Sequence, residues 1–173
     1  NFPNENNFFL SYSEISILGC SYGRRKNIND CISCIPGTYS NKIGTNTCEL
    51  CNFGYSSPSY ESSNCNLCAK GKYANLLGSS NCNSCGPGNY SENAGSKICK
   101  NCEGGKYNSK TGSTTPTDCL ECQNGKYSKK GFDSCLTCEL GKVTINKKYC
   151  HDCRLGTYSI NLDITSHDQC LKC

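Results

Sequence analysis

The stretch that decides the fold is residues 65–85, CNLCAKGKYANLLGSSNCNSC. Two C-x-x-C pairs enclose a loop in which Gly71 and Tyr73 follow the first pair and Gly78 comes five residues later. The first glycine suits a left-handed backbone, in which other residues meet a steric cost. The second suits the turn that brings the chain back to close the loop. We therefore expect two short extended arms joined by a turn.

This loop recurs along most of the chain, and such internal repeats indicate units that stack in a row. Eighteen of the 19 cysteines form nine C-x-x-C pairs, whose starts are 15 to 20 residues apart. One unit lacks the spacer and reads Gly54-Tyr55, and another has Val143 in place of the tyrosine. We predict a small disulfide-rich repeat protein, an elongated rod of short β-hairpin or loop units with little helix. Each unit is expected to contact only its neighbours.

The composition makes disulfides necessary. Ile, Leu, Val and Phe total 28 of 173 residues, too few for a large hydrophobic core. Cysteine at this density indicates bridges formed in an oxidising compartment, and so an extracellular or cell-surface protein. There is no apolar run long enough for a transmembrane segment, and the scattered net charge of +4 does not suggest nucleic acid as a partner. The 21 asparagines suit an AT-rich coding sequence, as in some protists.

The commonest pattern, C-x-x-C-x-x-G-x-Y-x(3–4)-G-x(3)-C-x-x-C, resembles the ephrin-receptor-like cysteine-rich repeats. It is also similar to the simplest loop module of the tumour-necrosis-factor-receptor family, and the resemblance covers residues 31–173. In that module the cysteine just before G-x-Y bonds the next cysteine along the chain. The resemblance therefore implies the bridges Cys34–Cys48, Cys51–Cys65, Cys68–Cys82, Cys85–Cys99, Cys102–Cys119, Cys122–Cys135, Cys138–Cys150 and Cys153–Cys170.

Three cysteines remain to be placed at the ends of this ladder. Cys31 lacks a partner, and Cys20 can supply one. Cys173 is then the odd cysteine, which predicts a bond outside this segment. Either the natural chain continues with another unit, or Cys173 bonds a neighbouring subunit. The resulting domain prediction is an apolar segment over 1–19, a disulfide loop over 20–33 and eight repeats over 34–173.

The amino-terminal segment differs from the repeats, because it lacks cysteine and holds three of the five phenylalanines. One interpretation is a cap packed over the first unit. The other is an assembly strand that adds to a second subunit and joins identical rods into a filament or coat. The apolar residues on which both interpretations depend are Phe8, Phe9, Leu10, Tyr12, Ile15, Ile17 and Leu18.

The cysteines and histidines could in principle bind zinc, carry redox chemistry or catalyse hydrolysis. Paired C-x-x-C motifs have nearly the spacing of structural zinc sites. Four-cysteine sites would use two pairs each, however, so nine pairs would leave one unused, and zinc binding does not explain the G-x-Y signature. Thioredoxin-type redox chemistry needs a helix start that is missing here. The two histidines, His151 and His167, do not make a catalytic constellation. We expect no catalytic residue, metal or cofactor. Asn89 begins the one N-glycosylation sequon, Asn89-Tyr90-Ser91, and is the predicted site of a glycan.

Two functional hypotheses follow. The first is a non-enzymatic structural protein, a segment of an extracellular fibril, coat or surface antigen that self-associates through residues 1–19. The alternative is a receptor-like or adhesin ectodomain that binds a protein or glycan partner. A binding module should concentrate unusual residues in one or two units. The departures in this chain, which are Val143, the missing spacer at Gly54-Tyr55 and the long loops, are spread along it and favour the structural hypothesis.

Overall fold

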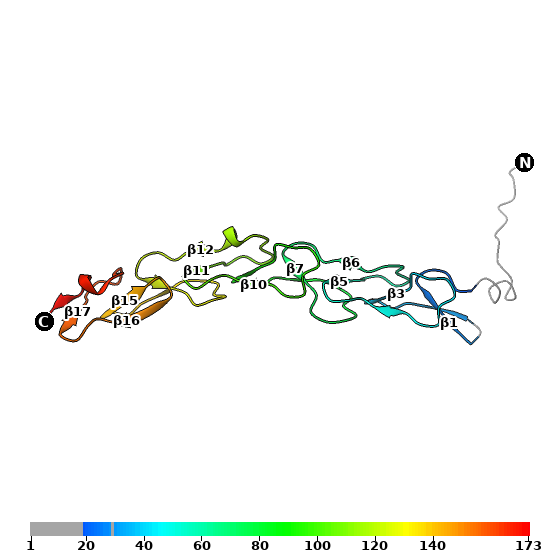
Figure 1. Cartoon of the computed structure of the whole chain (residues 1–173), viewed down its shortest axis with the longest axis horizontal. Coiled ribbons are helices and arrows are strands. Elements are labelled where there is room, and N and C mark those ends of the chain that lie inside the picture. The colour runs from blue at the N-terminus through cyan, green and yellow to red at the C-terminus, as the bar shows by residue number, and fades with distance from the viewer. Residues whose placement is uncertain (1–18, 29) are drawn as a thin grey trace, which may run out of the picture. The chain divides into compact units, whose positions relative to one another are not determined.

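The computed structural model describes residues 19–28 and 30–173 (Figure 1). The apolar residues from Phe8 to Leu18, on which the predicted cap or assembly strand depends, lie outside the described residues. The chain divides into two compact units. Among the described residues, one consists of those up to Leu67 together with Leu76–Asn81, and the other of Cys68–Asn75 and Cys82–Cys173.

The described residues form antiparallel two-stranded hairpins in chain order and no α-helix (Figure 1). In the first compact unit the pairs are β1 (Arg24–Asn27) with β2 (Asp30–Ser33), β3 (Thr38–Tyr39) with β4 (Glu49–Leu50), and β5 (Tyr55–Ser56) with β6 (Asn66–Leu67).

In the second compact unit the pairs are β7 (Lys72–Tyr73) with β8 (Asn83–Ser84), β9 (Asn89–Tyr90) with β10 (Lys100–Asn101), β11 (Lys106–Tyr107) with β12 (Leu120–Glu121), β13 (Lys126–Tyr127) with β14 (Leu136–Thr137), β15 (Lys142–Ile145) with β16 (Tyr149–Asp152), and β17 (Thr157–Tyr158) with β18 (Leu171–Lys172). Two single 3₁₀ turns, η1 (Pro116–Asp118) and η2 (His167–Gln169), occupy the two longest loops.

Each hairpin is closed by a disulfide, and the described residues contain nine of them. They join cysteines 11 to 17 residues apart: Cys20–Cys31, Cys34–Cys48, Cys51–Cys65, Cys68–Cys82, Cys85–Cys99, Cys102–Cys119, Cys122–Cys135, Cys138–Cys150 and Cys153–Cys170. Eight of them are the pairs that the resemblance to receptor modules implies, and Cys20–Cys31 is the pair expected from the cysteines that were left over. The fold is thus the small disulfide-rich repeat fold predicted from the sequence.

The buried interior consists of cysteines and small residues. Most of the cysteines that open a loop, such as Cys51 and Cys68, are fully buried, whereas the repeat tyrosines are half-buried or exposed. A second buried column lies six residues after each of these cysteines: Ser40, Ser57, Ala74, Ser91, Asn108, Ser128, Thr144 and Ser159. Hydrogen bonds satisfy the polar members of this column, which makes their burial tolerable. For example, the Ser128 hydroxyl donates to the Lys106 carbonyl (2.7 Å).

Backbone hydrogen bonds connect successive loops through the same column. The Gly37 N–H donates to the carbonyl of Ser57 in the next loop (2.7 Å), and the Ser57 N–H donates to the carbonyl of Ser79 in the loop after that (3.2 Å). The pattern recurs in the second compact unit, where the Ser91 N–H donates to the Ser113 carbonyl (3.0 Å). Stacking of the loops therefore satisfies backbone groups that isolated hairpins would leave open.

The prediction that each unit contacts only its neighbours is wrong, because loops also meet the loop after next. A Cβ on Gly37 would overlap the carbonyl oxygen of Gly78, two loops further on. The same close approach occurs between Gly125 and the carbonyl oxygen of Leu162. Glycine lets one backbone rest directly on another, and this allows the loops to interlock instead of only touching end to end.

Candidate functional site

The cysteines, which dominate the sequence, are engaged in structure. Among residues 19–28 and 30–173, eighteen are in disulfides and Cys173 is exposed and free. No group of three or more His, Cys, Asp or Glu in this part of the chain is placed to hold a metal ion. A candidate site has to be sought among the side chains that the ladder presents.

The loop closed by Cys51–Cys65 departs most clearly from the repeat, because its tyrosine has moved by one position. In the preceding loop Thr38 pairs with Leu50 and Tyr39 with Glu49. In this loop Tyr55 pairs with Leu67, so it occupies the position of Thr38. Successive residues of a strand face opposite sides, and a shift of one residue therefore moves the ring to the other face of the hairpin.

On that face Tyr55 lines an open groove with a volume of about 610 Å³. Leu50 and Leu77 line it too, and all three side chains remain more than a third exposed. The groove lies entirely within the first compact unit. Its other lining residues are Tyr39, Asn41, Glu49, Asn52, Asn64 and Cys65.

The position of Leu50 depends on the interlocking of the loops. A Cβ on Gly78 would lie 2.8 Å from Leu50 Cδ2, so the leucine side chain rests on the bare backbone of Gly78. Leu77 precedes this glycine and brings its own side chain to the same groove. The apolar part of the groove is thus assembled from three successive loops.

The charged part of the groove is a single hydrogen-bonded pair. The Tyr39 hydroxyl donates to Glu49 Oε2 (2.8 Å) across the β3–β4 hairpin. This hydrogen bond, with desolvation as the smaller cause, raises the pKa of Tyr39 above its ordinary value. The tyrosine therefore stays protonated, and the carboxylate keeps its second oxygen for another donor.

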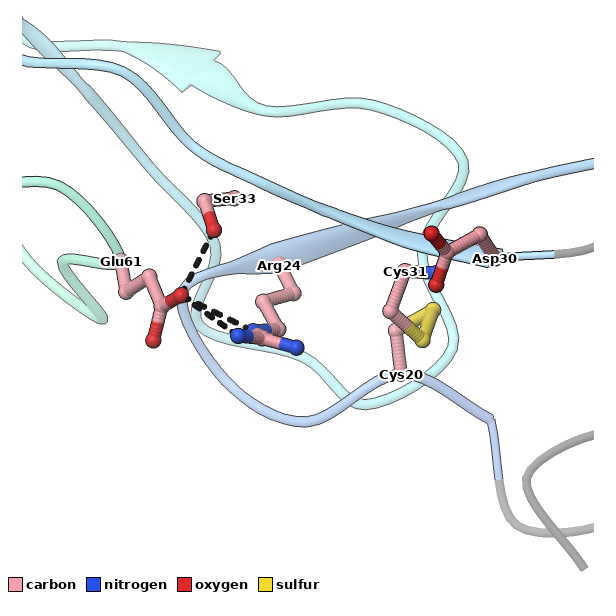
Figure 2. A network of polar contacts seen from close by, with 6 residues as sticks. All are labelled: Cys20, Arg24, Asp30, Cys31, Ser33 and Glu61. Atoms are coloured by element: carbon pink, nitrogen blue, oxygen red, sulfur yellow. Dashed lines mark hydrogen bonds and ion pairs between the residues drawn. A yellow bond between two sulfur atoms is a disulfide. The ribbon is translucent and has the colours of Figure 1, made fainter. Parts of the chain in front are cut away.

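The same loop departs from the repeat at a second point, its returning turn. Glu61 stands where other loops have the second glycine, and it adopts a left-handed conformation (φ 57°). Its carboxylate oxygen Oε1 accepts hydrogen bonds from Arg24 Nη2 (2.6 Å), Arg24 Nε (3.1 Å) and the Ser33 hydroxyl (2.6 Å). Figure 2 shows both donors directed at this one oxygen, beside the Cys20–Cys31 bridge.

These hydrogen bonds shift the ionisation of both partners. Arg24 first and Ser33 second lower the pKa of the Glu61 carboxyl, and the pKa of Arg24 is raised mainly by its hydrogen bond to Glu61. Glu61 therefore fixes the loop that carries Tyr55 to the β1–β2 hairpin.

Comparison with known proteins places the repeats. Residues 71–119 match the model of the tyrosine-protein kinase ephrin type A/B receptor-like family. This segment is similar to the ephrin-receptor-like repeats. A comparison with curated proteins found no match. Leu50, Tyr55 and Glu61 lie outside the matched segment.

Asn89 lies inside the ephrin-receptor-like repeats, on strand β9. Its Nδ2, the atom to which a glycan would be attached, donates to the Pro87 carbonyl (2.8 Å), and its Oδ1 accepts from Asn101 Nδ2 (2.9 Å). The sequon serine, Ser91, is buried. The sequon is thus part of the packed ladder, and glycan attachment at Asn89 stays a prediction.

The residues of the groove were not anticipated as a site. The missing spacer at Gly54-Tyr55 is visible in the sequence, but its effect on the direction of the ring depends on the strand register. Leu50, Asn64 and Leu77 are brought together only by contacts between loops. The one signal of this groove in the sequence is the shift of Tyr55 to the position that Thr38 occupies in the preceding loop.

Proposed function

We propose that this chain is an extracellular, non-enzymatic recognition module, a receptor-like ectodomain whose disulfide ladder presents the groove around Tyr55 to a partner. The ladder of nine disulfides fits an oxidising environment outside the cell. Within the described residues, no helix has the length and apolar character needed to cross a membrane.

One observation carries the proposal: the loop that breaks the repeat contributes Tyr55 to a groove that the neighbouring loops complete. In most other loops the position of Tyr55 is filled by Thr or Lys, for example Thr38 and Lys72. A purely structural ladder gains nothing from turning one exposed aromatic ring to a different face. Exposed aromatic side chains beside well-placed polar groups are typical of recognition surfaces.

The groove is suited to binding and poorly suited to catalysis. Of its lining side chains, Glu49 is the one carboxylate, and a tyrosine hydroxyl already occupies one of its oxygens. The groove is open, so it does not enclose a reacting group away from water. These features support a module without enzymatic activity.

The fibril hypothesis depended on residues 1–19, of which 1–18 lie outside the described residues. No feature of the described residues favours self-association over partner binding. We therefore adopt the receptor-like alternative.

The test is to incubate the purified, oxidised chain with arrays of extracellular protein domains and of glycans. We expect at least one partner that binds the wild-type chain and that Tyr55→Thr loses. The matched control is Tyr158→Thr, because Tyr158 is similarly exposed but lies outside the groove. Absence of any partner, or equal loss in both variants, would refute a recognition role for the groove.

A further inference from the structure

We propose that the groove formed by Leu50, Tyr55 and Leu77 binds a neutral oligosaccharide. This inference rests on the proposed recognition function and names the class of its ligand. It follows from the side chains that line the groove, from the backbone groups around it, and from what the other repeats carry at the same positions.

The groove offers two kinds of surface that a sugar ring needs. Tyr55 supplies a ring with few rotamers and Leu50 and Leu77 supply aliphatic surface, so all three can pack against the C–H faces of pyranose rings. The amides of Asn41 and Asn64 can each donate and accept, which matches the mixed character of sugar hydroxyls.

The charge of the groove points to a neutral ligand. Glu49 is the one charged residue among those that line it, and none of them is cationic. Sulfated or sialylated glycans are bound through Arg or Lys, which form charge-assisted hydrogen bonds with anionic oxygens. Here a negative ligand would instead face the Glu49 carboxylate.

A peptide strand is a poorer match, because backbone groups of Cys51 and Tyr55 beside the groove are already hydrogen-bonded. Strand addition requires a row of open N–H and C=O groups. The N–H of Cys51 donates to the Gly37 carbonyl (2.9 Å), and that of Tyr55 donates to the Asn52 carbonyl (3.1 Å). The Cys51 carbonyl accepts from the Gly78 N–H (2.7 Å). This favours recognition by the side chains that line the groove.

The other repeats do not reproduce this surface. The position of Tyr55 is a lysine in four of the later loops, Lys72, Lys106, Lys126 and Lys142. The position of Leu50 is Ser84, Asn101 or another polar residue in all later loops except at Leu67. We therefore expect one binding site per chain.

The experiment uses an array of neutral pyranose oligosaccharides together with sialylated and sulfated glycans, followed by calorimetric titration of the intact chain with each bound glycan. We expect a neutral oligosaccharide to bind with a stoichiometry of one and with the same affinity at low and high salt. Tyr55→Thr and Leu50→Ser should each weaken binding about tenfold or more. Tyr158→Thr and Leu120→Ser, which change similarly exposed residues outside the groove, should leave the affinity unchanged.

Equal thermal unfolding curves for all four variants would show that the losses arise in the groove and not from misfolding. Binding restricted to sulfated or sialylated glycans would overturn the inference. Binding of an extracellular protein domain, lost in Tyr55→Thr and without any bound glycan, would overturn the inference but uphold the recognition function. No binding to the glycan array or to the array of extracellular protein domains would overturn both the inference and the recognition function.

Discussion

At the scale of single residues, two demands meet at the first glycine of several repeats. Gly37 has φ of +86°, and the carbonyl oxygen of Gly78 lies where its Cβ would be. The first demand is visible in the sequence, because glycine before an extended tyrosine predicts a left-handed backbone. The second is not, because it arises from a loop two repeats away. Gly141 has a similar φ of +78° but has open space at its Cβ position.

This contrast yields a prediction for alanine substitutions. Gly141→Ala should cost only the left-handed strain, about 1–2 kcal/mol. Gly37→Ala should cost more than about 3 kcal/mol, because the methyl group must also displace the backbone at Gly78. Thermal unfolding of the oxidised proteins measures both. Equal destabilisation of the two variants would show that the loops do not interlock at Gly37.

The tyrosine and the residue after it show where residue-level prediction succeeds and fails. The G-x-Y signature is conspicuous in the sequence, and it locates strands such as β7 and β9. The signature does not predict the buried residue that lies six residues after the loop-opening cysteine in all eight repeats and that directly follows the tyrosine in six of them. Serine and alanine have little side chain to signal burial by hydrophobicity. Their role follows from the short distance between stacked loops.

At the scale of elements, a two-residue strand is too short to determine its own orientation. The register of β5 with β6 is set by the Cys51–Cys65 bridge and by the loops on either side. Because the bridge and the neighbouring loops fix the backbone independently of Tyr55, its ring is turned toward the groove. The sequence alone therefore predicts the hairpin at this position, but not the surface that the hairpin presents.

The Arg24–Ser33–Glu61 network connects two of these elements and makes their association sensitive to acid. The folded pKa of Glu61 is lowered, so its contribution to stability is complete above its ordinary value of 4.5 and is lost as the pH falls through the folded value. We expect wild type to have a higher Tm than Glu61→Gln at neutral pH, and the difference to vanish in acid.

The control for this prediction is Glu139→Gln, which breaks an exposed ion pair with Lys142 inside a single loop (3.0 Å). This change should leave the Tm and its dependence on pH close to those of wild type, because such pairs contribute little. A Glu61→Gln variant with the same acid profile as wild type would contradict the structural role assigned to Glu61.

At the scale of the whole molecule, disulfides stabilise the fold in place of an apolar interior. Each bridge closes a loop of 11 to 17 residues. Closing a loop of that size is worth about 3 kcal/mol in the chain-entropy model. Within each compact unit, hydrogen bonds and interlocked glycines then convert the closed loops into a stack. The ladder could be anticipated from the cysteine spacing and the family resemblance. The contacts to the loop after next could not, because the repeat pattern describes single loops.

The most direct test of this account is peptide mapping of the protein under non-reducing conditions. We expect eight bridges that each join the second cysteine of one C-x-x-C pair to the first cysteine of the next, a ninth bridge Cys20–Cys31 before them, and Cys173 outside the ladder. Bridges within single C-x-x-C pairs, or free thiols that bind zinc, would contradict it.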